Sequence, residues 1–261
     1  MKKVGIIGAG KIGGSLLLRL SESGGFDLGV SDIHPEQLNL YRERGISTTS
    51  SNRELADESD LLIVAVKPWD VIQVMQEISP SFEGTDKAVT SVAAGVSIAR
   101  ISESLPEGTA ILRVMPNVCA SVGLGSAVVT ANEAGQSVIP TVMDIFRYVG
   151  DVQELPERLF DAATALHGSG PAYVALFADA LIQAGVREGI PRDVARRLVI
   201  STIGGTSVLL KERSAHQVRD EVMTPGGTTA AAFVAMEKAG FVAAVYDGVE
   251  AATERARRLG A

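Results

Sequence analysis

The chain carries near its beginning the stretch Lys3-Val-Gly-Ile-Ile-Gly8-Ala-Gly10-Lys-Ile-Gly13. The stretch starts as a compact apolar run, typical of a buried strand of a parallel sheet, and leads into an amphipathic helix. Gly8, Gly10 and Gly13 join the strand to the helix at the spacing of a dinucleotide-binding turn. The first glycine allows a tight turn, the second lets the backbone approach a pyrophosphate, and the third lets the helix pack on the strand. This pattern predicts a dinucleotide site.

An acidic residue stands where such a site needs one. A second strand is expected at Phe26–Ser31 and ends at Asp32, nineteen residues after Gly13. An acid near this spacing hydrogen-bonds the ribose 2′-hydroxyl and repels a 2′-phosphate. Asp32 therefore favours NAD over NADP, although Ser31 and His34 beside it are able to accommodate a phosphate.

Strands and helices alternate up to about residue 150. Further strands are expected at Leu61–Ala65, Lys87–Ser91, Ala110–Val114 and Ser126–Thr130, and helices at Asp70–Ile78, Ser97–Leu105 and Gln136–Tyr148. Loops that follow parallel strands meet at one edge of the sheet, where a ligand is expected. Such loops hold Asn52, Lys67, Ala94, Gly95 and Asn117. From spacing alone, a helix cap explains Asn52 and a solvated charge explains Lys67 equally well.

From about Glu154 the pattern changes to helices alone. They are expected at Pro156–Leu166, Tyr173–Glu188, Pro191–Glu212, Ser214–Val222 and Val242–Leu259. The helix at 173–188 is apolar on nearly every face, so it requires burial on most sides. We therefore predict a homodimer formed through helices. The two domains are expected at residues 1–150 and 151–261.

A second glycine-rich turn, Thr224-Pro-Gly-Gly-Thr-Thr229, precedes a further apolar segment. Free N–H groups at the start of a helix, together with the helix dipole, favour an anion, whereas an ordinary helix–helix turn explains the same residues. The C-terminal half has few side chains that could act as a catalytic acid. His167 is one candidate, but a core or capping role explains it equally well. Reduction of a protonated C=N bond needs no strong acid, because the iminium already carries its proton.

Composition excludes several classes of protein. Of the 261 residues, 46% are hydrophobic and 21% charged, an ordinary globular balance. A net charge of −7 without a run of Lys or Arg argues against nucleic acid or an anionic membrane as partner. The single cysteine, Cys119, fits a reducing cytoplasm, and the three scattered histidines predict no metal site. The apolar start is too short and glycine-rich for a signal peptide or a membrane span.

Several motifs resemble those of the pyrroline-5-carboxylate reductase family. They are Gly8–Gly13, Ala65–Pro68, Ala94-Gly95, Arg113–Asn117, Ala165–Tyr173, Ala184–Pro191 and Val222–Thr229. The resemblance spans essentially the whole chain. It implies reduction of Δ1-pyrroline-5-carboxylate to L-proline with NADPH or NADH, the last step of proline biosynthesis. It also implies an N-terminal Rossmann-like, doubly wound α/β sheet followed by an all-α domain that forms a homodimer, often within larger rings.

The resemblance also implies roles for individual residues. The cofactor-binding set is Gly8, Ala9, Gly10, Lys11, Ile12, Gly13, Asp32, Asn52, Ala65, Val66, Lys67, Pro68, Ala94, Gly95 and Asn117. The substrate-binding set is Ser169, Gly170, Pro171, Thr224, Gly227, Thr228 and Thr229. Within it, Thr229 is the candidate catalytic residue, through a hydrogen bond to the ring nitrogen of the imino acid.

Three other functions compete with this reading. A related cyclic imino acid is an alternative substrate, because Thr224 stands where the family commonly has Ser and Val118-Cys119 where it commonly has Thr-Pro. A β-hydroxyacid dehydrogenase of similar plan would need a Lys or His acid, for which His167 is the candidate. A dinucleotide-binding regulator would not need the second glycine-rich turn.

Overall fold

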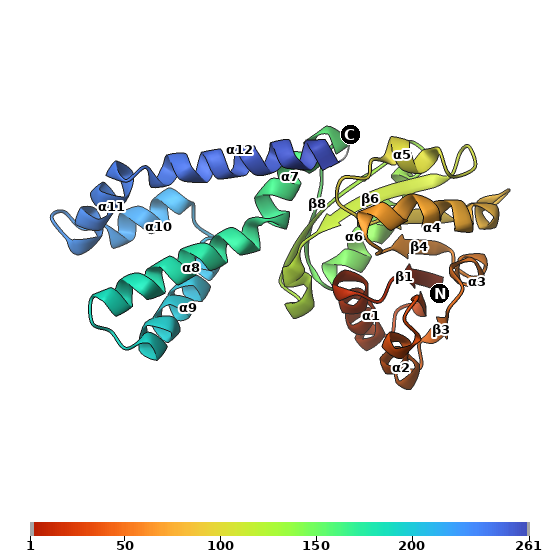
Figure 1. Cartoon of the computed structure of the whole chain (residues 1–261), viewed down its shortest axis with the longest axis horizontal. Helices are drawn as coiled ribbons and strands as arrows, with labels where there is room; N and C mark the ends of the chain where they lie inside the picture. The colour runs from red at the N-terminus through yellow and green to blue at the C-terminus, as the bar shows by residue number, and fades with distance from the viewer. Residues whose placement is uncertain (1–2, 260–261) are drawn as a thin grey trace. The chain divides into compact units, whose positions relative to one another are not determined.

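The computed structural model describes residues 3–259, which form two compact units (Figure 1). The first unit runs to Ser169 and also includes the end of the chain from Ala252. The second unit is Gly170–Ala251. Each unit is described by itself below.

The first unit is built on an eight-stranded sheet with the order β3-β2-β1-β4-β5-β6-β7-β8. The strands are β1 (Lys3–Ile7), β2 (Asp27–Ser31), β3 (Ser47–Thr49), β4 (Leu61–Val64), β5 (Ala88–Ser91), β6 (Ala110–Pro116), β7 (Gly125–Ala131) and β8 (Gly150–Glu154). Neighbouring strands are parallel except for the antiparallel pair β6–β7. The direction of winding reverses at β1, which lies between β2 and β4. This confirms the expected doubly wound, Rossmann-like sheet.

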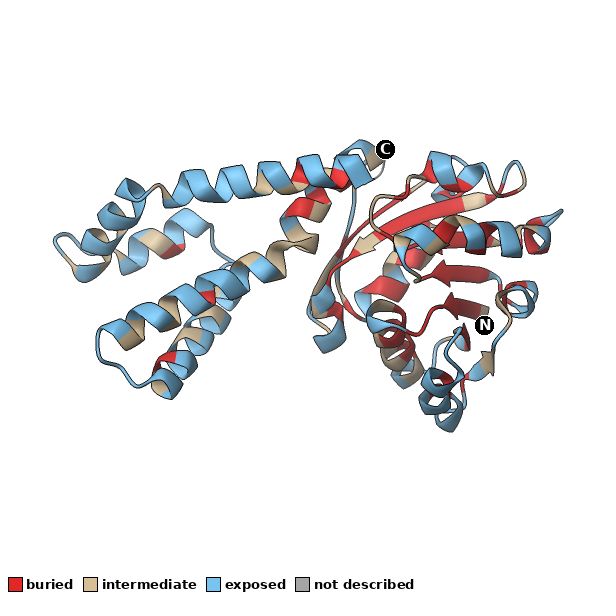
Figure 2. Cartoon of the chain, in the orientation of Figure 1, coloured by how far each residue is buried: buried red, intermediate tan, exposed pale blue. Residues whose placement is uncertain are grey.

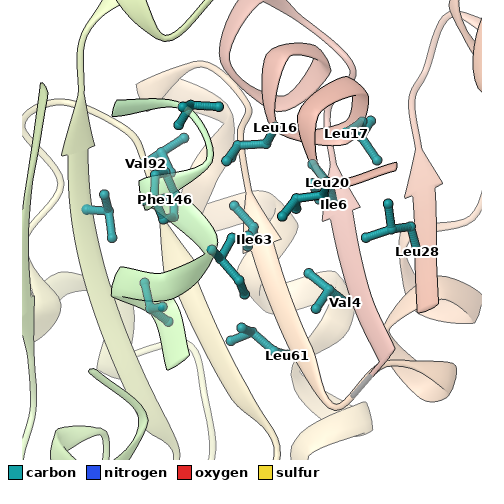
Figure 3. Packing of buried hydrophobic residues seen from close by; sticks show 14 of the residues in the cluster. Val4, Ile6, Leu16, Leu17, Leu20, Leu28, Leu61, Ile63, Val92 and Phe146 are labelled. Carbon is teal, nitrogen blue, oxygen red and sulfur yellow. The ribbon is translucent and has the colours of Figure 1, made fainter. Parts of the chain in front are cut away.

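Helices cover both faces of the sheet. One face packs against α1 (Lys11–Ser23), α2 (Pro35–Glu43) and α6 (Ile139–Arg147), and the other against α3 (Asn52–Glu58), α4 (Val71–Ile78) and α5 (Ile98–Ser102). Successive side chains of a strand point to opposite faces. In β1, Ile6 therefore joins Leu16 and Phe146 in one core (Figure 3), while Ile7 packs in the other.

The sheet extends past residue 150, where we expected the first domain to end. Strand β8 pairs with β7 through Gly125–Val129, and only Val152 of β8 is buried. Phe160 of α7 (Phe160–Ala163) is fully buried and packs with Val128, so this segment also belongs to the first unit. The helix expected at Pro156–Leu166 is instead a 3₁₀ turn, the short α7 and a π turn at Thr164–Gly168.

The second unit is helical, as expected. It contains α8 (Gly170–Arg187), α9 (Arg192–Leu209), α10 (Ala215–Val222), α11 (Thr228–Lys238) and the larger part of α12 (Phe241–Leu259). Helices α8 and α9 lie side by side (Figure 1). Ala178 is the only buried residue of α8, and α11 has none (Figure 2). Most apolar side chains of these helices are therefore not buried within one chain.

Candidate active site

The expected cofactor residues of the first unit lie at one edge of the sheet. Each follows the carboxyl end of a parallel strand: Gly8 after β1, Asp32 after β2, Asn52 after β3, Ala65–Pro68 after β4, Ala94-Gly95 after β5 and Asn117 after β6. Three main-chain hydrogen bonds hold neighbouring strand ends together, from Gly8 to Ser31, from Ala65 to Ile7 and from Val92 to Val64, at 2.8–3.1 Å. Ligands of doubly wound folds bind outside this edge, next to the reversal of strand order.

The three glycines of the first turn have different surroundings. Gly8 has φ +99°, and a Cβ there would lie 2.7 Å from the Ala65 carbonyl oxygen. A Cβ on Gly13 would overlap the carbonyl oxygen of Gly8. A Cβ on Gly10 would meet nothing within 4 Å. Gly8 and Gly13 are thus needed for packing, whereas Gly10 borders open space that a pyrophosphate is able to fill.

Helix α1 offers free backbone donors beside that space. Its first intrahelical hydrogen bond runs from Gly14 N to Gly10 O at 2.7 Å. The N–H groups of Lys11, Ile12 and Gly13 precede this bond and therefore have no acceptor within the helix. Gly10, the N-cap, has no side chain that could cap them. These donors and the helix dipole fit a phosphate group.

The spacing indicated that Asp32 contacts a ribose, and the structure shows that its carboxylate also binds two main-chain N–H groups. Its Oδ2 accepts a hydrogen bond from Ala9 N at 2.7 Å, and its Oδ1 accepts one from His34 N at 2.8 Å. The carboxylate thus fixes the glycine turn to the loop after β2. A carboxylate oxygen has two lone pairs, so each oxygen retains capacity for a ribose hydroxyl.

Asn52 belongs to a polar network that the sequence did not indicate. Its Oδ1 accepts from Ser31 Oγ at 2.8 Å, and its Nδ2 donates to Glu77 Oε2 at 2.9 Å. The helix cap that spacing suggested for Asn52 is supplied by Ser51, whose hydroxyl accepts from Glu54 N. The amide of Asn52 is therefore held at the end of β2 through Ser31, the residue that precedes Asp32 in the chain. Lys67, in contrast, is exposed after β4.

An ion pair between buried Arg113 and half-buried Glu157 holds the loop after β5. Arg113 is 4% exposed, lies 3.1 Å from Glu157 through Nη1, and stacks over the ring of Phe160 at 4.9 Å. Glu157 Oε1 also accepts from Ile98 N at 2.8 Å, at the start of α5. The loop that carries Ala94 and Gly95 is thereby tied to the segment after β8. Because Arg113 and Glu157 are far apart in sequence, no local pattern could have predicted this pair.

His167 is not placed to act as an acid. Burial lowers the pKa of its imidazole, an effect that the main chain of Ser126 partly opposes. Neither ring nitrogen has a hydrogen-bond partner in the described part of the chain, and both atoms are buried. Burial therefore favours the neutral form of the ring. His167 therefore does not supply the catalytic acid that a β-hydroxyacid dehydrogenase would need.

The second glycine-rich turn lies in the other unit, between α10 and α11. Gly226 has φ +69°, and a Cβ on Gly227 would overlap Thr224 Oγ1. Gly227 is the N-cap of α11 and provides no side-chain cap, so the first N–H groups of the helix remain free. The hydroxyls of Thr228 and Thr229 make no hydrogen bond within residues 3–259. The turn thus presents uncommitted donors on a helix of eleven residues.

Ser169, Gly170 and Pro171 are half-buried at the start of α8, Ser169 being the last residue of the first unit along the chain and Gly170 the first of the second. Among residues 3–259, no three His, Cys, Asp or Glu side chains come together as a metal site would require. No single described helix is long and apolar enough to cross a membrane; α11 and α12, bent by 51° at the break between them, pass that test only as a pair, by length and composition.

A dinucleotide turn at the reversal point of a doubly wound sheet, continued by a helical unit, is the plan of NAD(P)-dependent oxidoreductases. Family comparisons refine this class. Residues 3–95 match the family model "NADP oxidoreductase coenzyme F420-dependent", and residues 157–259 match "pyrroline-5-carboxylate reductase dimerisation".

Full-length relatives give the same result. The chain is 38% identical to pyrroline-5-carboxylate reductase of Synechocystis sp., over 99% of this chain and 98% of the relative. The solved reductase of Coxiella burnetii matches with a TM-score of 0.95 at 30% identity, over 100% of this chain and 99% of that one. The Plasmodium falciparum enzyme with NADP bound matches at 0.87 and 33% identity, over 100% and 98%. This chain belongs to the pyrroline-5-carboxylate reductase family.

Proposed function

We propose that this protein reduces Δ1-pyrroline-5-carboxylate to L-proline with NADH or NADPH, in proline biosynthesis. The observation that carries the proposal is the second glycine-rich turn. Its free helix N–H groups and unbonded Thr228 and Thr229 hydroxyls suit a small carboxylate that carries a ring nitrogen. Full-length similarity to pyrroline-5-carboxylate reductases supports the same substrate.

The first unit fits a nicotinamide dinucleotide. The free N–H groups of α1 and the open space at Gly10 are assigned to the pyrophosphate, with Ala9, Lys11 and Ile12 in the same turn. Asp32 and Asn52 are assigned to the adenosine ribose. The rest of the nucleotide is assigned to residues that follow the adjoining strands: Ala65, Val66, Lys67, Pro68, Ala94 and Gly95.

Reduction of a protonated C=N bond needs little general acid–base catalysis from the protein. A bound reduced nicotinamide would supply the hydride to the C=N carbon of the protonated iminium, whose π electrons would pass to nitrogen to give a secondary amine. Thr224, Gly227 and Thr228 hold the carboxylate, and Thr229 hydrogen-bonds the ring nitrogen. Ser169, Gly170 and Pro171 form the wall of the substrate site. The protein therefore acts mainly by orienting the imino acid.

The direct test is the oxidation of reduced nicotinamide by Δ1-pyrroline-5-carboxylate, followed by absorbance with NADH and with NADPH in parallel. We expect turnover with both, and kcat/KM about tenfold higher with NADH, because the Asp32 carboxylate repels a 2′-phosphate. Glu36 lies 3.6 Å from His34 Nδ1 and adds a second negative charge to this loop. If neither NADH nor NADPH supported turnover, the proposed function would be refuted. A preference for NADPH would refute only the proposed role of Asp32 and would leave the proposed function standing.

We further propose that the second unit pairs with that of another copy of the chain. Val174 and Leu176 of α8 are 52% and 72% exposed, Leu198 of α9 is 55% exposed, and Tyr246 of α12 is 71% exposed. Soluble monomers rarely leave so many large apolar side chains open to water. The match of residues 157–259 to a dimerisation family supports a homodimer, and larger rings are an extension of it.

Light scattering over a dilution series tests the homodimer. We expect the molar mass of at least a dimer at micromolar concentration, and loss of activity wherever dilution produces monomers. A folded, active monomer would contradict the proposal. A cytoplasmic location remains a prediction from the single cysteine.

A further inference from the structure

The π turn before α8 leaves one main-chain carbonyl in need of a donor. In an α-helical continuation, the carbonyl oxygen of His167 would accept a hydrogen bond from residue 171. That residue is Pro171, which has no N–H group. Partly buried carbonyl groups are almost always hydrogen-bonded in folded proteins.

Asn117 supplies the missing donor from the end of β6. Its Nδ2 donates to the His167 carbonyl oxygen at 3.1 Å. Its Oδ1 accepts from Cys119 N and from Ser126 N, both at 3.2 Å, so the amide is anchored on β7 and on the turn after β6. The side chain is 9% exposed. These bonds fix which way the amide points.

A second contact seats the same turn on β6. A Cβ on Gly168 would lie 3.0 Å from Met115 Cε, so the glycine allows a close approach to the strand. The next residue, Ser169, donates its N–H to Thr164 O at 2.9 Å, while its hydroxyl makes no hydrogen bond in the described part of the chain. Ser169 is thus held by its main chain with its hydroxyl free.

We propose that Asn117 is a positioning residue for the imino acid, acting through the His167 carbonyl to hold the Ser169 hydroxyl at the carboxyl edge of the sheet. The inference rests on the proposed function, because it takes Ser169 as a substrate-binding residue. It assigns Asn117 a role different from the nucleotide contact expected from its motif. It also gives His167 a role, through its main-chain oxygen and not through its ring.

The chain contains a matched control for this arrangement. Asn132 follows β7 at the opposite end of the same antiparallel pair. Its Oδ1 accepts from Ile111 N and Gly135 N at 3.0 and 2.9 Å, and its Nδ2 donates to Thr109 O at 2.8 Å. It therefore makes the same set of bonds, far from the edge where the site lies.

The test compares Asn117→Asp with Asn132→Asp. In each variant the acceptor oxygen is kept, and the donor is replaced by an oxygen that repels the carbonyl. We expect both to lower the thermal midpoint by similar amounts. Only Asn117→Asp is expected to raise KM for Δ1-pyrroline-5-carboxylate, by about tenfold, as for the loss of one well-placed hydrogen bond. The dissociation constant of NADH, measured by its fluorescence, should change less than twofold.

Asn117→Ser covers the case in which the aspartate variant does not fold. A serine hydroxyl is able to cap Cys119 N but is too short to reach His167, so the same rise in KM is expected. Equal KM values for the Asn117 and Asn132 variants would overturn the inference. Weakened NADH binding that matches the rise in KM would also overturn it, in favour of a nucleotide contact. If the wild-type protein reduces Δ1-pyrroline-5-carboxylate, either result overturns only the role of Asn117 and leaves the proposed function intact. If the wild-type protein shows no turnover, both the proposed function and the role of Asn117 are refuted.

Discussion

Replacing Gly10 by valine is expected to weaken NADH binding by more than about 100-fold, because the new side chain occupies the space assigned to the pyrophosphate. Two to three hydrogen bonds between backbone N–H groups and a charged phosphate would be lost, each contributing about 1.5–3 kcal/mol. The thermal midpoint of the nucleotide-free protein should shift by no more than about 2 °C. Gly10 has φ −69° and ψ −163°, an extended conformation with negative φ that does not require glycine.

The two other glycines of the motif predict a different outcome. Gly13→Ala places a methyl group against the carbonyl oxygen of Gly8, and Gly8→Ala forces φ +99° on a residue with a Cβ. Both changes act on folding as well as on binding. They should lower the thermal midpoint even without nucleotide. Gly10 therefore separates the nucleotide contact from the packing of the turn.

Gly25→Val is the matched control for Gly10→Val. Gly25 follows the opposite end of α1, is exposed, and has only Ser23 Oγ near the position of a Cβ, at 3.9 Å. The control should bind NADH like the unchanged protein. Isothermal titration of all variants with NADH measures the effect. If Gly10→Val bound within about threefold of the unchanged protein, the pyrophosphate would have to lie elsewhere.

The sequence predicts the first unit well because its signals are local. A glycine spacing, apolar runs and an acid after the second strand identified the doubly wound sheet and the edge that carries the site. Strands β3 and β8 were missed, because β3 is the polar triplet Ser-Thr-Thr and β8 buries only Val152. Both are edge strands, and an edge strand needs no apolar run to pair.

The connections between distant residues could not be predicted in the same way. Asp32 was expected to face a ribose, and its two bonds to Ala9 and His34 became visible only in the folded chain. The same holds for Arg113 with Glu157 and for Asn117 with His167. In the pairs Asp32–Ala9, Arg113–Glu157 and Asn117–His167 the partners are distant in sequence, so only the folding of the sheet brings them together.

Replacing Thr229 by valine is expected to lower kcat/KM for Δ1-pyrroline-5-carboxylate by about 100-fold. Valine has the shape of threonine without the hydroxyl, so it leaves the start of α11 intact while it removes the hydrogen bond to the ring nitrogen. A hydrogen bond to a charged group contributes about 1.5–3 kcal/mol, so removing the hydroxyl oxygen that accepts from the iminium N–H has an effect of about this size. NADH binding should be unchanged.

Thr229→Ser is the control that separates the hydroxyl from the rest of the side chain. It keeps the hydroxyl that accepts from the iminium N–H and removes one methyl group, so kcat/KM is expected to stay within about threefold of the unchanged protein. The Thr229 side chain is half-buried and N-cap Gly227 makes no side-chain bond, so neither change removes a helix cap. Steady-state kinetics with saturating NADH measure both variants. If the valine variant were as active as the wild-type protein, the Thr229 hydroxyl would have no role. The backbone N–H groups of α11 would then have to orient the imino acid. An impaired serine variant beside a fully active valine variant would mean that Thr229 acts through its methyl group and not through a hydrogen bond.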